Sequence, residues 1–160
     1  MRLVSFSLPN QPIRPGLVIG EEVIDLSDPA TGLPATMREL LALGPGALDQ
    51  VRATPAGSAA RHGRAEVALH APVPDPPVIL AIGMNYRAHV AEMGRDAPEW
   101  QYWFNKQRTA IAGPGDPIVL PTVSDMVDYE GELALVIGRR CQHVPATRAH
   151  EVIAGYTVIN

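Results

Sequence analysis

The sequence contains a single cysteine, Cys141, among its 160 residues. One thiol cannot form an internal disulfide, so we expect a protein of the reducing cytoplasm. No apolar run approaches the roughly 18 residues that a membrane-spanning helix needs. The apolar stretch near the N-terminus is also too short for a signal peptide. Together these features predict a soluble cytoplasmic protein that does not bind membranes.

Neither sign of charge dominates the chain. Lys and Arg number 13 and Asp and Glu number 17, which gives a formal net charge of −4. The two signs are mixed along the sequence, and no basic patch indicates a nucleic-acid partner. A hydrophobic content of 46% with 19% charged residues is typical of a folded globular chain rather than a disordered one. The 16 prolines and 14 glycines predict many turns and short elements.

A proline-rich segment, Ala71–Pro77, is the best candidate for a domain boundary. It carries four prolines in seven positions, and such a segment is extended and stiff. The hydrophobic pattern changes after it. We therefore predict an N-terminal domain over residues 1–70, a linker over residues 71–77 and a second domain over residues 78–160.

The N-terminal domain is expected to be rich in short strands. One strand is predicted over residues 3–7, and another over residues 66–70. Residues 16–20 and 22–26 are apolar segments separated by Gly20-Glu21, a pattern that predicts a hairpin. The region between these strands should contain the helices.

Two helices are predicted between residues 36 and 52. Thr36-x-x-Glu39 has the spacing of a capping box, and an apolar stripe follows it up to Gly44-Pro45. A second short helix is expected over residues 47–52. Residues 54–64, rich in Ala, Gly and Arg, are interpreted as a loop.

The second domain is expected to mix strands and helices. Residues 78–82 are continuously apolar, which favours a buried strand. A short helix is predicted over residues 86–93, ended by Gly94, and an aromatic cluster follows it. Further strands are expected over residues 118–120, 129–137 and 153–159, and a helix within residues 144–152.

Three acidic residues alternate along one predicted strand. Alternate residues of a strand point the same way, so Asp128, Glu130 and Glu132 should share one face. A half-exposed strand with a solvent-exposed acidic face is the common explanation for such a pattern. The alternative is a bound cation, because neighbouring carboxylates repel unless a cation separates them. Oxygen ligands suit Mg²⁺, Mn²⁺ or Ca²⁺ rather than zinc. The spacing alone leaves both interpretations open.

His89 and Glu92 stand three residues apart on the helix predicted over residues 86–93, so they should be neighbours on its surface. A carboxylate beside a histidine orients the ring, which is the usual arrangement for a general base. A surface ion pair explains the same spacing. A third interpretation makes both residues metal ligands, although the spacing is not that of two-histidine zinc helices.

Five blocks follow one another in the second half of the sequence. They are Ile82-Gly-Met-Asn-Tyr-Arg-Ala-His-Val-Ala-Glu-Met-Gly94, Phe104-Asn-Lys106, Gly113-Pro-Gly-Asp-Pro-Ile118, Asp128-Tyr-Glu-Gly-Glu-Leu-Ala-Leu-Val-Ile-Gly138 and Ala154-Gly-Tyr-Thr-Val-Ile-Asn160. Taken in this order, they resemble the fumarylacetoacetate hydrolase family over about residues 66–160. Residues 1–65 are similar to the variable N-terminal domain of bacterial members.

The resemblance implies an α+β fold, in which a small β-rich N-terminal domain precedes part of a mixed β-roll. Members usually pair as dimers, so a homodimer is expected. Glu130 and Glu132 are implied to be two of three carboxylate ligands of Mg²⁺ or Mn²⁺, with Ca²⁺ as an alternative. His89 and Glu92 are implied to form a catalytic dyad on a mobile lid helix, and Lys106 to help form the substrate pocket.

The activity implied by the resemblance is metal-dependent hydrolysis of a C–C bond, or decarboxylation, in small 2-oxo or 1,3-dicarbonyl acids such as acylpyruvates or oxaloacetate. Isomerase, hydratase and lyase activities of the same family are alternatives. The family's third metal ligand is an aspartate directly after an asparagine that matches Asn160, where this sequence stops. We therefore expect residues 78–160 to form an incomplete catalytic domain. A non-catalytic fragment is the remaining alternative.

Overall fold

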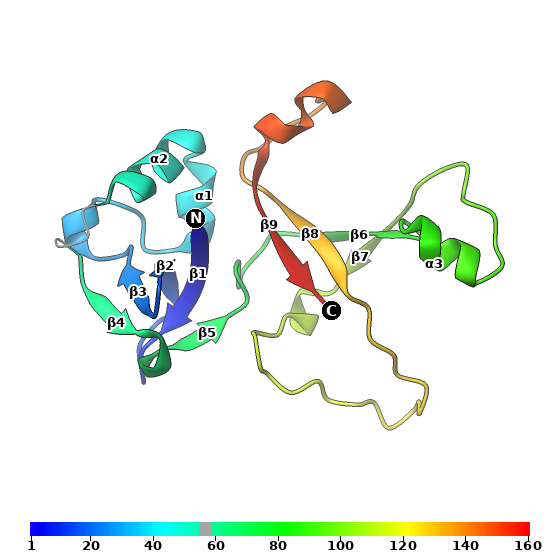
Figure 1. The fold of residues 1–160 in the computed structure, drawn as a ribbon, viewed down its shortest axis with the longest axis horizontal. Helices are drawn as coiled ribbons and strands as arrows, with labels where there is room; N and C mark the ends of the chain where they lie inside the picture. Colours follow the sequence, from blue (N-terminus) through cyan, green and yellow to red (C-terminus); the bar gives the residue numbers. More distant parts are fainter. Residues whose placement is uncertain (55–58) are drawn as a thin grey trace. The chain divides into compact units, whose positions relative to one another are not determined.

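The computed structural model describes residues 1–54 and 59–160 (Figure 1). The chain divides into two compact units, Met1–Pro74 with Ala112–Asn160, and Asp75–Ile111, and each is described by itself. The junction at residue 74 lies within the proline-rich segment. The domain limits expected from the sequence stay a prediction. No helix of the described residues is long and apolar enough to cross a membrane.

An antiparallel sheet of five strands forms the N-terminal part of the first unit. Its strand order is β4-β3-β2-β1-β5. The strands are β1 (Arg2–Ser7), β2 (Arg14–Ile19), β3 (Glu22–Asp25), β4 (Arg61–Gly63) and β5 (Ala68–His70). The predicted strand over residues 3–7 is confirmed, and so is the predicted hairpin. Ile19 pairs with Glu22, and Gly20 takes the positive φ of 58° that the tight turn requires.

The loop expected over residues 54–64 needs correction. Residues 55–58 lie outside the described part, but β4 pairs with β3 through Arg61 and Ile24. A 3-10 helix, η2 (Arg64–Glu66), follows β4, so the strand expected from residue 66 begins only at Ala68. The Glu66 carboxylate accepts a hydrogen bond from the Gly63 N–H at 2.7 Å, a contact that ends the strand and starts this turn.

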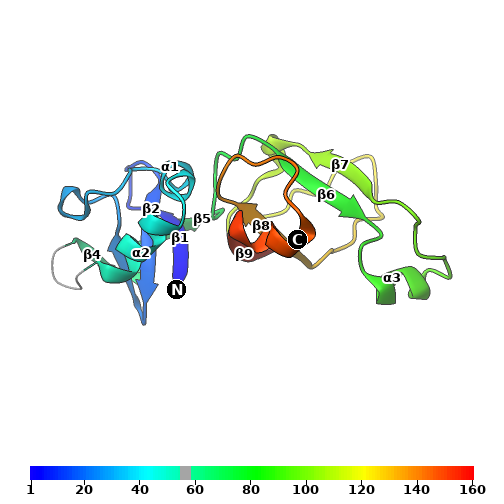
Figure 2. The same ribbon diagram turned by 90° about the horizontal axis from the view of Figure 1, so that it is seen from above.

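Helices α1 (Met37–Ala42) and α2 (Pro45–Ala53) cover one face of the five-stranded sheet (Figures 1 and 2). The predicted helix start is confirmed, because the Thr36 side chain accepts a hydrogen bond from the Glu39 N–H at 3.2 Å. The Thr36 hydroxyl also donates to the Glu39 carboxylate at 2.7 Å. The short 3-10 helix η1 (Pro29–Thr31) lies between β3 and α1.

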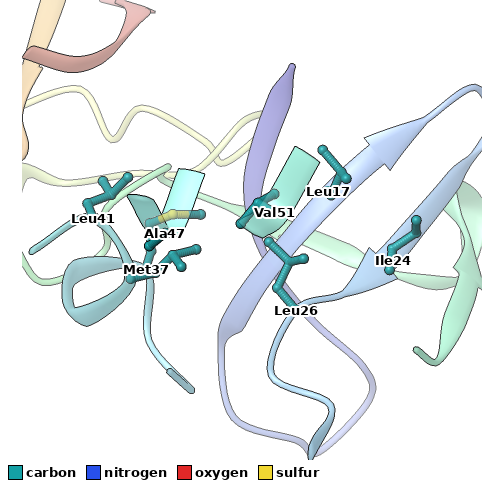
Figure 3. Close-up of a cluster of buried hydrophobic side chains, with 8 residues drawn as sticks. Leu17, Ile24, Leu26, Met37, Leu41, Ala47 and Val51 are labelled. Atoms are coloured by element: carbon teal, nitrogen blue, oxygen red, sulfur yellow. The ribbon is translucent and has the colours of Figure 1, made fainter. Parts of the chain in front are cut away.

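The hydrophobic core of the described residues lies almost entirely in residues 1–74. Figure 3 shows the larger cluster, in which side chains of β2 and β3 meet those of α1 and α2. It consists of Leu17, Ile24, Leu26, Met37, Leu40, Leu41, Ala47 and Val51. Phe6, Val23 and Val67 pack on the opposite face of the sheet. Outside residues 1–74, only Val90 and Val152 of the described hydrophobic residues are buried.

A two-stranded sheet forms the C-terminal part of the first unit. β8 (Glu132–Ile137) and β9 (Ile153–Ile159) pair antiparallel, and the 3-10 helix η4 (Ala146–Glu151) precedes β9. The strand predicted over residues 153–159 is confirmed. The helix predicted within residues 144–152 is a 3-10 helix rather than an α-helix.

Two strand predictions in this region are wrong in whole or in part. Residues 118–120 form no strand, because Pro117 and Pro121 flank them and lack the N–H that pairs with a neighbour. The strand expected from residue 129 starts only at Glu132. Asp128, Glu130 and Glu132 therefore do not follow one continuous strand.

The second unit is a hairpin with a helix in its connection. β6 (Ile79–Gly83) pairs antiparallel with β7 (Tyr102–Lys106), and α3 (Arg87–Glu92) lies between the two strands in the sequence. The 3-10 helix η3 (Arg108–Ala110) follows β7. The predicted helix is confirmed, with Gly94 at a positive φ of 64° after its end. The predicted strand near residues 78–82 is found, but not buried, since Leu80 is 55% exposed. β7 was not predicted as a strand.

Candidate functional site

Glu132 is the first residue of β8, where it pairs with Ile159 of β9. From Glu132 onward the predicted alternation is confirmed. Glu132, Ala134 and Val136 are half-buried. Leu133, Leu135 and Ile137, on the other face, are exposed. The backbone that carries the Glu132 carboxylate is therefore held in a regular strand.

Glu130 lies outside the strand, but its backbone is held. Its N–H donates a hydrogen bond to the side-chain oxygen Oδ1 of Asn160 at 2.7 Å. Asn160 follows directly after β9, so this contact joins the segment before β8 to the end of its neighbour. No local sequence pattern indicated it, because the two residues are thirty positions apart.

The two glutamate side chains have no hydrogen-bond or ion-pair partner in the part of the chain that the structure describes. The neighbouring Asp128 differs, since its Oδ1 accepts a hydrogen bond from the Tyr129 N–H at 2.8 Å. Two carboxylates without a protein partner suit a hard divalent cation, and Mg²⁺ is commonly held by one or two carboxylates plus water and substrate. The donor set of Glu130 and Glu132 therefore fits Mg²⁺ or Mn²⁺, although residues 1–54 and 59–160 contain no group of three His, Cys, Asp or Glu that could hold a metal.

His89 and Glu92 lie on α3, as predicted. The Nδ1 atom of His89 is 3.7 Å from Oε2 of Glu92, and the side chains are 58% and 82% exposed. This distance is longer than a hydrogen bond, so the ring is beside the carboxylate without being bonded to it. The arrangement suits a base whose orienting contact forms when the site closes, and it also suits a surface ion pair.

α3 is short and buries little of its own surface. It has six residues, the side chain of its N-cap residue Tyr86 does not cap the helix, and one of its side chains, Val90, is buried. Short helices without caps have low intrinsic stability. This fits the expectation that the helix belongs to a mobile segment.

Lys106 lies at the end of β7, where its Nζ is 5.4 Å from the centre of the Phe104 ring. Lys106 pairs with Ile79, the first residue of β6, whereas α3 follows the last residue, Gly83. Four residue steps along a strand span about 13 Å. Within this unit, then, Lys106 and the His89–Glu92 pair lie toward opposite ends of the hairpin. The two glutamates belong to the other unit.

A second charged group, not anticipated from the sequence, lies beside β9. Two of the three guanidinium nitrogens of Arg148, Nε and Nη2, donate to the Glu151 carboxylate at 2.8 Å, and Nη2 of Arg139 lies 3.6 Å from it. The hydrogen bonds from Arg148 lower the pKa of Glu151 below its ordinary value. The adjacent cavity, which Leu41, Leu48 and Ala154 help to line, measures about 30 Å³. It has room for a water molecule and not for an organic acid.

Known proteins resemble this chain in sequence and in fold. The fumarylacetoacetate (FAA) hydrolase C-terminal family matches residues 78–160. A mitochondrial oxaloacetate tautomerase of Bos taurus, FAHD2A, is 41% identical over 162 residues, which cover 99% of this chain and 51% of that protein. The chain thus spans about half the length of the curated relatives it matches.

Two solved structures extend the comparison. The maleylpyruvate hydrolase of Sphingobium sp. SYK-6, in complex with manganese(II) and pyruvate, is 33% identical with a TM-score of 0.75. The match covers 99% of this chain and 57% of that one. The 5-carboxymethyl-2-hydroxymuconate delta-isomerase of Mycobacterium smegmatis is also 33% identical, with a TM-score of 0.68 over 99% and 53% of the two chains. The predicted family and the predicted α+β fold, matched over about half the length of these structures, are confirmed.

Proposed function

The chain belongs to the fumarylacetoacetate hydrolase family, and we propose that the protein carrying it is a metal-dependent enzyme that acts on a small 2-oxo or 1,3-dicarbonyl acid. The reaction proposed first is hydrolysis of a C–C bond, as in an acylpyruvate, or decarboxylation, as in oxaloacetate. The observation that carries the proposal is the pair of unpartnered carboxylates, Glu130 and Glu132, at the start of β8. Both lie in the segment that the family matches.

In this proposal Glu130 and Glu132 hold Mg²⁺ or Mn²⁺, with Ca²⁺ as the alternative. When bound, the ion supplies Lewis acidity toward the keto and carboxylate oxygens and stabilises the enolate that forms as the neighbouring bond breaks. The complex of the Sphingobium relative with manganese(II) and pyruvate supports this pairing of metal and acid.

A third carboxylate ligand belongs to the proposal as well. The sheet ends close to the two glutamates, since Glu132 pairs with Ile159 and the next residue, Asn160, contacts Glu130. The family resemblance implies an aspartate directly after Asn160. Its carboxylate would complete a set of three with Glu130 and Glu132.

His89 is the proposed general base. For hydrolysis it takes a proton from a water molecule whose oxygen attacks the distal carbonyl, the C–C bond breaks, and the enolate then receives the proton. Glu92 orients the imidazole ring. Lys106 is proposed to bind a carboxylate of the substrate through its ammonium group.

A second candidate is a tautomerase or isomerase of the same class of acids. The 41% identity to an oxaloacetate tautomerase over 99% of this chain favours it. This reaction needs the same enolate and no attacking water. The expected homodimer and cytoplasmic location belong to the proposal as well.

The test is an activity panel on the full-length protein. Oxaloacetate, an acylpyruvate and maleylpyruvate are each assayed after treatment with EDTA and again after addition of Mn²⁺ or Mg²⁺. The proposal expects turnover of at least one acid that EDTA abolishes and Mn²⁺ restores. Release of pyruvate identifies the hydrolase or decarboxylase, and enol–keto conversion without cleavage identifies the tautomerase. Absence of turnover with every acid, or turnover insensitive to EDTA, would favour the non-catalytic alternative or a different chemistry.

A further inference from the structure

The backbone around the proposed metal ligands is regular at one glutamate and irregular at the other. Glu132 lies within β8, but residues 128–131 belong to no strand. In an extended segment alternate residues point the same way, so a fixed, extended backbone between Glu130 and Glu132 would let both carboxylates face one ion. The contacts that hold the backbone of Glu130 therefore bear on the geometry of the site.

Asn160 makes such a contact. Its Oδ1 accepts the hydrogen bond from the Glu130 N–H at 2.7 Å, just past the end of the paired segment Glu132–Ile159. A side-chain oxygen of the residue that follows β9 thereby binds the backbone of Glu130. Of the described residues, no other makes a hydrogen bond to Glu130.

We propose that Asn160 is a positioning residue for the metal site, which fixes the backbone of Glu130 so that its carboxylate and that of Glu132 face one ion. The inference rests on the proposed function for the identity of the ion. Partners that orient metal ligands typically change metal affinity by about 10–100-fold when they are removed.

The test uses full-length protein freed of metal. Asn160→Ala removes the acceptor, and Asn160→Asp keeps an acceptor oxygen at the same position. Thr157→Ala is the matched control, since Thr157 lies in β9, three residues before Asn160, and its side chain has no hydrogen-bond partner in the described part of the chain. Mn²⁺ affinity is measured by electron paramagnetic resonance, and exchange of the Glu130 amide by NMR.

The expected result is a loss of about 10–100-fold in Mn²⁺ affinity for Asn160→Ala and no change for Thr157→Ala. The Glu130 amide, protected without metal in the wild type, should exchange faster in Asn160→Ala and regain protection in Asn160→Asp. In a Glu130→Gln, Glu132→Gln background, the further change Asn160→Ala should leave the residual Mn²⁺ affinity unaltered.

The outcomes separate the two proposals. If Asn160→Ala binds Mn²⁺ as tightly as the wild type, or leaves exchange of the Glu130 amide unchanged, the positioning role is wrong while the metal site stands. If the wild type binds no Mn²⁺, or the double glutamine variant binds it equally well, the metal site is wrong, and the positioning role is wrong with it. A lower melting temperature of Asn160→Ala with unchanged Mn²⁺ affinity would show a merely structural contact.

Discussion

The Nδ1 atom of His89 lies 3.7 Å from the Oε2 atom of Glu92 on the exposed surface of α3. The two side chains are adjacent but not hydrogen-bonded, because the separation exceeds hydrogen-bond length. A general base would be oriented by this contact when the site closes. If His89 were a metal ligand, one of its ring nitrogens would instead have to be free to bind the ion.

His89→Ala is expected to lower kcat by about 10²–10⁴, the usual contribution of a general base. Mn²⁺ affinity should stay nearly intact, because in our account His89 does not bind the ion. Steady-state kinetics and Mn²⁺ titration of the full-length protein measure both quantities. Arg87→Ala on the same helix is the control and should change neither. Loss of Mn²⁺ binding in His89→Ala would favour the metal-ligand interpretation instead.

Residues 83–106 are expected to be the most mobile part of the catalytic domain without ligand. The helix within them has six residues and one buried side chain, so little packing free energy opposes its opening. Binding of a 2-oxo acid should order it by closing the site. Hydrogen exchange, compared with and without oxalate in the presence of Mn²⁺, measures this ordering. The core amides of β2 and β3 serve as the internal reference, and equal protection of α3 in both states would contradict a lid.

Gly16→Ala is expected to destabilise the N-terminal sheet. A Cβ at Gly16 would lie 2.6 Å from Cγ1 of Val23 and 2.8 Å from Cδ1 of Phe6, inside a packed core. Such overpacking typically costs about 1–3 kcal/mol of the free energy of unfolding. Urea denaturation followed by circular dichroism measures the change.

Gly46→Ala is the matched control for this variant. A Cβ at Gly46 would meet nothing within 4 Å, and the residue lies in α2. Replacing a helical glycine by alanine should leave stability unchanged or raise it by up to about 1 kcal/mol. Equal stability of Gly16→Ala and the wild type would show that the Phe6–Val23 contact can shift to make room.

Local signals in the sequence predicted the N-terminal domain well. The spacing of Thr36 and Glu39 set the start of α1, and Gly20 set the turn between β2 and β3. Each of these signals acts within a few residues, so the local sequence alone determines the helix start and the turn. The N-terminal elements were therefore predicted with small errors at their ends, apart from η1, β4 and η2, which were not predicted.

The second half was predicted less well, because its elements depend on distant partners. β8 begins at Glu132 rather than at Tyr129, since its extent is set by pairing with β9. β7 was missed, because its residues 102–104 were interpreted as an aromatic cluster. The prediction that the strand near residue 80 is buried was also wrong, because an apolar run does not indicate which neighbouring elements will cover it. The family resemblance, rather than periodicity, supplied the candidate site.

Metal binding at Glu130 and Glu132 is the central claim, and one titration tests it most directly. Metal-free full-length protein and its Glu130→Gln, Glu132→Gln variant are titrated with Mn²⁺ by calorimetry. Glutamine nearly preserves the size of each side chain but removes its negative charge, so the fold should persist, as circular dichroism would verify. The account predicts saturable binding by the wild type and loss of that binding in the double variant. Equal Mn²⁺ affinity of the two folded proteins would contradict it.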